Sequence, residues 1–193
     1  MGIIKFFKRI WSQLHRFVLW AVLLTLFWVW IYARVGDPPR EQKVVVYIDA
    51  YDVDQRDLSL RLEARGLPEG IKMIQARGFD YVYFGTTLQG DVYVIKESLL
   101  RTNLEGGRLA PIGLPEGMQG LESGGQVYGI RIFDPETQQG PAMNDILYAP
   151  YPDPEPEAYY LCFDADSVHL AGRPGAVDNA AWEVALSLLT MEP

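Results

Sequence analysis

Residues 17–33 (FVLWAVLLTLFWVWIYA) form a run of seventeen amino acids without a charged side chain. A helix needs about 17–25 largely apolar residues to cross the hydrocarbon core of a bilayer, so this run is just long enough. Its second half holds the aromatic residues Phe27, Trp28, Trp30 and Tyr32. Aromatic rings of this kind favour the membrane–water interface. The sequence therefore predicts a transmembrane anchor over residues 17–35, with the lipid bilayer as its partner.

A cleaved signal peptide and a buried core helix are the alternatives for this run. A signal peptide has a shorter apolar core and small residues at the cleavage site, whereas Ala33-Arg34-Val35 follows here. A lipoprotein anchor needs a cysteine after the run, but the only cysteine is Cys162. We therefore expect an uncleaved signal anchor.

Charge around the run predicts its orientation. Residues 1–16 carry four basic side chains and no acidic one, and Arg34 alone follows the run closely. Basic flanks stay in the cytoplasm, which predicts a cytoplasmic N-terminus and an extracellular C-terminal domain in a single-pass cell-membrane protein. Within residues 1–16, apolar side chains recur at spacings of three and four: Ile3, Phe6, Phe7, Ile10, Trp11 and Leu14. This spacing predicts a basic amphipathic segment beside the anionic inner leaflet.

The rest of the chain is acidic. Residues 37–193 carry twelve Lys or Arg against twenty-five Asp or Glu, a net charge of −13. Such a domain repels nucleic acid, so no nucleic-acid partner is expected. A lone cysteine cannot form an internal disulfide, which favours a bacterial envelope protein over a disulfide-stapled module. Residues 36–42 (GDPPREQ) predict a short spacer, and residues 43–193 are long enough for one extracytoplasmic domain.

Short apolar runs predict strands at residues 44–48, 71–74, 91–95, 127–133 and 159–163. Helices are predicted at residues 54–65, with Asp54 as cap, and at 178–189, with Asp178 as cap and Trp182 facing inward. Leucines at every second position of residues 58–62 also fit a strand, and this alternative stays open. Continuously apolar strands alternating with helices predict an α/β domain with a largely parallel sheet.

Four short motifs follow one another in this domain. They are residues 68–73 (PEGIKM), 90–95 (GDVYVI), 107–112 (GRLAPI) and 125–130 (GQVYGI). In this order they resemble the first lobe of a bacterial extracellular solute-binding protein, the receptor of an ABC sugar importer, although Arg131 stands where that family has proline. The resemblance implies a Rossmann-like lobe, a short helix after the second motif and a small solute such as a sugar. Family members close two lobes on their ligand, so this chain would be a truncated, membrane-tethered relative with one open lobe.

Candidate ligand-binding residues follow from the fold and from the resemblance. Open α/β sheets bind ligands beyond the carboxyl ends of their strands, where Asp49, Tyr51 and Asp52 follow the first strand. In sugar receptors aromatic rings stack on pyranose rings, which adds Phe84 and Tyr128, and a loop between strands adds Thr86 and Thr87. The alternatives are ordinary core packing for the aromatic residues, capping for Asp54 and solvation for the other aspartates.

Residues 163–169 (FDADSVH) gather acid, hydroxyl and imidazole groups. Asp164, Asp166 and His169 are candidate metal ligands, and a turn held by Asp and Ser side chains is the alternative. Catalytic Ser–His–acid groups normally converge from separate segments, and the chain has no G-x-S-x-G motif. We therefore expect a non-enzymatic domain without a cofactor that binds a small solute or a partner protein. The alternatives are an accessory envelope protein packed on another membrane component and an acid- or metal-dependent hydrolase.

Overall fold

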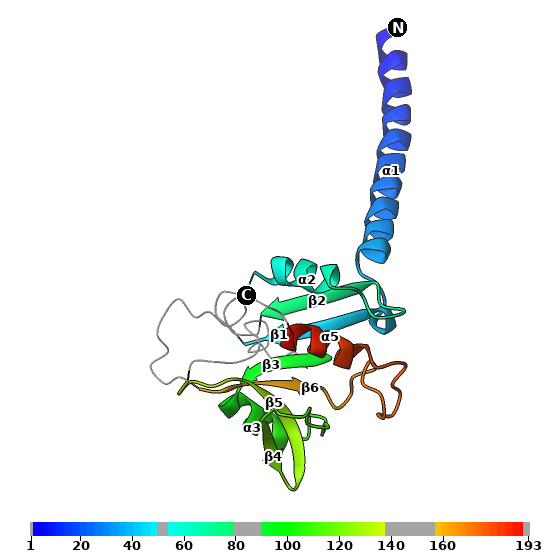
Figure 1. The fold of residues 1–193 in the computed structure, drawn as a ribbon. Coiled ribbons are helices and arrows are strands. Elements are labelled where there is room, and N and C mark those ends of the chain that lie inside the picture. The colour runs from blue at the N-terminus through cyan, green and yellow to red at the C-terminus, as the bar shows by residue number, and fades with distance from the viewer. Residues whose placement is uncertain (1, 50–53, 79–89, 138–156, 191–193) are drawn as a thin grey trace. The chain divides into compact units, whose positions relative to one another are not determined.

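The computed structural model describes residues 2–49, 54–78, 90–137 and 157–190, without the side chains of residues 2–10, 12 and 33–35. The chain divides into two units, residues 1–38 and residues 39–193. Figure 1 shows the elements of each unit along the chain. The first unit is a single helix, and the second is an α/β domain.

Helix α1 (Gly2–Gly36) runs without a break through both segments predicted before the spacer, residues 1–16 and 17–35. Its window Gln13–Tyr32 is long and apolar enough to cross a membrane, and none of the window is buried within the structure. Twenty residues at 1.5 Å each give about 30 Å, the thickness of a hydrocarbon core. The Thr25 hydroxyl, inside the window, donates to the Ala21 carbonyl at 2.8 Å, so the helix satisfies it internally.

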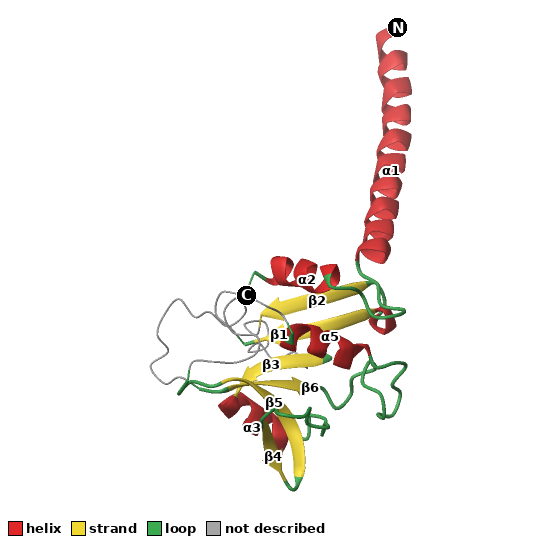
Figure 2. Cartoon of the chain, viewed as in Figure 1, coloured by secondary structure: helices red, strands yellow, loops and turns green. Residues whose placement is uncertain are grey.

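The second unit is built on a six-stranded sheet in the order β2-β1-β3-β6-β5-β4 (Figure 2). Its strands are β1 (Lys43–Ile48), β2 (Met73–Gly78), β3 (Val92–Lys96), β4 (Gly120–Ser123), β5 (Gln126–Phe133) and β6 (Tyr159–Phe163). Its helices are the short 3-10 helix η1 (Arg40–Gln42), α2 (Gln55–Ala64), α3 (Glu97–Glu105) and α5 (Ala180–Leu189). The α/β class is as predicted.

The expectation of a largely parallel sheet is wrong. Strand β1 is parallel to both neighbours, β2 and β3, but the pairs β3–β6, β6–β5 and β5–β4 are antiparallel. Strands β4 and β5 are joined through Gly124 and Gly125, both at positive φ (58° and 77°), and a two-residue turn can join only antiparallel strands. Strand β6 misled the prediction because it is apolar throughout and almost fully buried, a pattern typical of parallel strands.

Helices cover both faces of the sheet. On one face α2 and α5 bury Leu58, Leu62, Val184 and Leu188 against Val44 and other residues of the sheet. On the other face α3 buries Leu100 in a second cluster with Tyr93, Ile95 and Tyr160. Residues 55–64 are thus a helix, and the strand alternative for them is wrong. Helix α3 stands where the resemblance implies a short helix.

Candidate functional site

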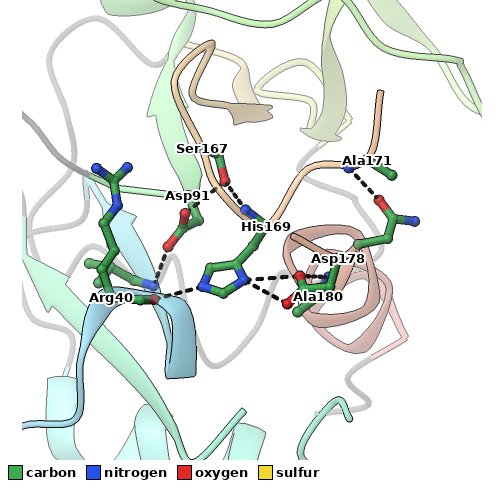
Figure 3. Close-up of polar contacts among 9 residues, drawn as sticks. Arg40, Asp91, Ser167, His169, Ala171, Asp178 and Ala180 are labelled. Carbon is green, nitrogen blue, oxygen red and sulfur yellow. Dashed lines mark hydrogen bonds and ion pairs between the residues drawn. The ribbon is translucent and has the colours of Figure 1, made fainter. Parts of the chain in front are cut away.

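A buried carboxylate joins β1, β3 and the loop after β6 (Figure 3). Asp91, directly before β3, is 1% exposed. One of its carboxylate oxygens accepts from the Val45 amide at 2.9 Å, and the other accepts from the Ser167 hydroxyl at 2.7 Å. Because both oxygens have a donor, the penalty for burying this charged group is largely offset.

The imidazole of His169 lies beside this carboxylate and is fully buried. Its backbone amide donates to the Ser167 hydroxyl at 3.1 Å. Its ring Nε2 is 2.8 Å from the Arg40 carbonyl oxygen, and its Nδ1 is 2.9 Å from one carboxylate oxygen of Asp178 and 3.1 Å from the other. A carbonyl and a carboxylate can only accept, so a ring with a proton on both nitrogens satisfies both contacts.

These contacts hold the first residues of the domain. Arg40 is bound at its carbonyl by His169 and at its guanidinium, which donates to the Asp166 carbonyl at 3.3 Å. Asp178 also accepts from the Ala180 amide at 2.9 Å, at the start of α5. We call Arg40, Asp91, Ser167, His169 and Asp178 the entry network, because it lies where the chain enters the domain.

A second buried acid, Asp164, lies in the loop that follows β6. The Asp164 carboxylate accepts from the Tyr93 hydroxyl and from the Asp166 amide, the latter at 2.7 Å. Burial raises the pKa of Asp164 above its ordinary value. Burial, followed by the Asp164 charge and hydrogen bond, raises the pKa of Tyr93 far above its ordinary value, so Tyr93 is the donor of this pair. The ring of Tyr93 stacks on that of Tyr47 with 5.9 Å between the centroids.

An open hollow of about 330 Å³ adjoins the entry network. Its lining comes from three segments and includes Pro111, Ile112, Leu170, Arg173, Asn179 and Trp182. The Arg173 guanidinium donates to the Pro111 carbonyl at 3.4 Å, and the Asn179 side-chain oxygen accepts from the Ala171 amide at 3.2 Å. Trp182 packs on Phe163 with 5.2 Å between ring centroids. The volume lies at the lower end of small-molecule sites, and the lining offers aromatic, guanidinium and amide groups.

Of the sequence-predicted ligand residues the structure describes Asp49 and Tyr128, and neither lines this hollow. Asp49 follows β1 and its amide donates to the Val94 carbonyl at 2.8 Å, whereas Tyr128 lies on β5, with β3 and β6 between them. The Tyr128 hydroxyl donates to the Gln126 side chain at 3.1 Å. The remaining predicted ligand residues lie outside the described residues: Tyr51, Asp52, Phe84, Thr86 and Thr87.

The candidate metal ligands Asp164, Asp166 and His169 do not form a metal centre. Among the described residues no group of three or more His, Cys, Asp or Glu side chains could hold a metal ion. Both ring nitrogens of His169 are already engaged by Asp178 and Arg40. The alternative, a turn held by Asp and Ser side chains, is confirmed by the contacts from Asp164 to the Asp166 amide and from Ser167 to the His169 amide.

The entry network is not arranged for nucleophilic catalysis. The Ser167 hydroxyl donates to Asp91 and not to the His169 ring, and both residues are almost completely shielded from solvent. Cys162 packs in the core, and burial raises the pKa of its thiol well above its ordinary value, so it has little thiolate. The geometry of these groups favours holding segments together over reacting with a substrate.

Sequence reasoning missed the roles of Asp91 and Arg40. The sequence held one signal for Asp91, an acidic residue at the start of an apolar strand. A carboxylate buried there needs hydrogen-bond donors. Arg40 had no signal, since its contact with His169 is made by a backbone carbonyl. Asp178, predicted as the cap of α5, lies one residue before the capping position Asn179. Its side chain accepts from the Ala180 amide at the start of the helix, and its bond to His169 was not foreseen.

Comparisons with known proteins add nothing to this description. No protein-family model, no curated protein and no solved structure matches the chain.

Proposed function

We propose that this chain is a single-pass membrane protein whose C-terminal domain is a non-enzymatic binding module outside the cytoplasm. The observation that carries the proposal is the apolar window Gln13–Tyr32 of α1. None of that window is buried within the structure. A helix that is apolar all round needs either a protein core or lipid to cover it, and lipid is the cover we propose here.

Charge supports the orientation. The basic residues Lys5, Lys8, Arg9 and Arg16 precede or open the window, and every acidic residue of the chain follows it. Basic residues near the end of a span are retained in the cytoplasm, so the acidic domain would be outside. Residues 37–39 separate α1 from η1 along the chain.

The hollow supports a small polar solute, such as a sugar, as the ligand. Trp182 could offer a ring for stacking, while Arg173 and Asn179 could offer polar groups to hydroxyls. An open hollow on one domain is also what the resemblance to a single solute-binding lobe implies. The single lobe would enclose its ligand less completely than a two-lobed receptor, so we expect weak binding.

Cysteine labelling of the full chain in intact cells tests the topology. Native Cys162 is fully buried and provides an unreactive background. We expect a membrane-impermeant maleimide to label the Glu116→Cys variant in intact cells, and the Gly2→Cys variant only after permeabilisation. The reverse pattern would contradict the orientation, and release of the chain by alkaline carbonate would contradict the anchoring.

A thermal-melt screen of the full chain in detergent micelles tests solute binding. A ligand at about a hundred times its Kd adds roughly 2.7 kcal/mol to the free energy of unfolding. We expect a shift with one class of sugar that the Arg173→Gln variant loses and the Arg101→Gln variant, altered on α3, retains. No shift with any sugar, amino acid or oligopeptide would overturn the solute proposal and leave a partner protein as the ligand.

A further inference from the structure

We propose that the hollow binds a sugar that carries a carboxylate, a hexuronate, with the Arg173 guanidinium on the carboxylate and the Trp182 ring on the sugar ring. This ligand class rests on the proposed function, because the same hollow is the site. A neutral sugar would leave the guanidinium without its anion and bind more weakly.

The charge of the lining is opposite to that of the domain. Residues 37–193 have a net charge of −13, yet the described residues of the lining include one charged side chain, Arg173, and no acidic one. Asp178 and Glu183 adjoin lining residues along the chain but do not line the hollow, and the Asp178 carboxylate is bonded to the His169 ring. The hollow is thus a locally positive site, which favours an anionic ligand over a neutral one.

The Arg173 guanidinium has donors left for a ligand. Among the described residues, its one hydrogen bond is to the Pro111 carbonyl, at 3.4 Å, and it makes no ion pair. A guanidinium has several N–H donors in one plane, and this contact uses one of them. Parallel donors match both oxygens of a carboxylate, and such a charge-assisted pair is stronger than a bond to a neutral hydroxyl. The guanidinium is therefore suited to a carboxylate.

The start of α5 forms part of the wall but leaves the anion to Arg173. The first amides of the helix, those of Ala180, Ala181 and Trp182, already donate to oxygens of the protein. Asn179, just before them, accepts at its side-chain oxygen from the Ala171 amide, and the described contacts leave its NH2 group as a donor. This group and the part-exposed Trp182 ring are suited to the hydroxyls and the apolar face of a sugar.

Backbone hydrogen bonds hold the walls of the hollow in place. The Ile112 amide donates to the Val127 carbonyl at 2.8 Å, so the wall on that side is fixed to β5. The Val177 amide donates to the Val168 carbonyl at 2.8 Å, which closes the loop that carries Arg173. A ligand therefore meets walls that need little further ordering, and this lowers the entropic cost of binding.

Fluorine NMR of the full chain in detergent micelles, labelled with 5-fluorotryptophan, tests the ligand class. Trp182 is the only tryptophan of residues 39–193, and the Trp182→Phe variant identifies its signal. The probes are glucuronate, galacturonate and mannuronate, each with its uncharged methyl ester and its neutral parent sugar, and acetate. We expect one hexuronate to move the Trp182 signal and to bind at least about tenfold more tightly than its ester and its parent sugar.

The outcomes separate the ligand class from the proposed function. Equal affinity for a hexuronate and its methyl ester would overturn the carboxylate but leave sugar binding in place. A response to acetate at the same concentrations would show an anion site without sugar recognition, and would overturn the hexuronate as ligand. No response to any sugar, charged or neutral, would overturn both the ligand class and the proposed solute site.

Two variants locate the contact with the carboxylate. In the Arg173→Gln variant the affinities for the acid and its ester should come within about twofold of each other. The Arg101→Gln variant, changed at an exposed position of α3, should bind as the wild type does. An unchanged preference for the acid in Arg173→Gln would overturn the assignment. The comparison of acid and ester is made on the unaltered chain, so it decides the ligand class even if the variant does not fold.

Discussion

The carboxylate of Asp91 serves two donors from distant parts of the chain, the Val45 amide and the Ser167 hydroxyl. We expect the Asp91→Ala variant to lower the free energy of unfolding by about 2–4 kcal/mol, because both donors stay buried without a partner. Urea denaturation of the full chain in detergent measures this. The Asp57→Ala variant, on the exposed side of α2, should stay within about 0.5 kcal/mol of wild type. If Asp91→Ala lowers the free energy of unfolding by no more than this control does, the Asp91 carboxylate contributes little to stability.

Asp164 should make stability depend on pH in a defined direction. Burial raises its pKa, so the folded protein keeps a proton that the unfolded chain has already lost. The contribution of this group to stability therefore falls as the pH rises from the unfolded pKa to the folded one. We expect the free energy of unfolding of the wild type to fall relative to that of the Asp164→Asn variant over the mildly acidic range. Denaturation curves at several pH values measure the free energy of unfolding of the wild type minus that of the variant. If this difference stays constant or grows as the pH rises, Asp164 does not have a raised pKa in the folded protein.

The roles that could be predicted from the sequence are those of residues whose partners lie close along the chain. Asp54 bonds the amides of Arg56 and Asp57, two and three positions away, so its capping role was visible in the sequence and is confirmed. Asp91 and Val45 are 46 positions apart, and His169 and Arg40 are 129 apart. Contacts at such separations depend on strand order, which local pattern does not carry. The residues of the hollow were hidden for the same reason.

At the scale of elements, α2 protects the open edge of the sheet. Strand β2 is an edge strand, and its Ala76 and Ile74 amides donate to the side chains of Ser59 and Glu63 at 2.8 and 3.0 Å. Unpaired edge amides are templates for pairing with another chain. We expect the Ser59→Ala/Glu63→Ala double variant to lose about 2 kcal/mol of stability and to self-associate as its concentration rises. Sedimentation velocity in detergent measures the association.

The matched control for the edge is Arg56→Ala on the same helix. Its side chain is exposed and it should remain as monodisperse as the wild type. If the double variant loses stability but stays monodisperse, the two side chains stabilise β2 without guarding it. If neither property changes, the hydrogen bonds to α2 contribute nothing measurable.

Elements with a strong apolar pattern were predictable, and elements without one were not. Residues 159–163 are a strand as predicted, and α2 and α5 lie within one or two residues of their predicted ranges. Strand β4 was missed because it has a single buried residue, Leu121. Strand direction was mistaken because a strand covered on both faces is apolar in either direction. The pattern of apolar residues thus predicts where the strands of this sheet lie better than it predicts how they pair.

At the scale of the whole molecule, the test that matters most is whether α1 and the domain behave as separate units. Leu23 lies near the middle of the window Gln13–Tyr32, and an arginine there costs about 3 kcal/mol in a bilayer. We expect the Leu23→Arg variant to be partly extracted by alkaline carbonate, while the Trp11→Arg variant, changed outside the window, stays in the membrane. The urea midpoint of the domain should be equal in both, because residues 39–193 hold their own core. If Leu23→Arg instead unfolds the domain, α1 is a core helix; if it remains fully membrane-bound, something other than this window provides the anchor.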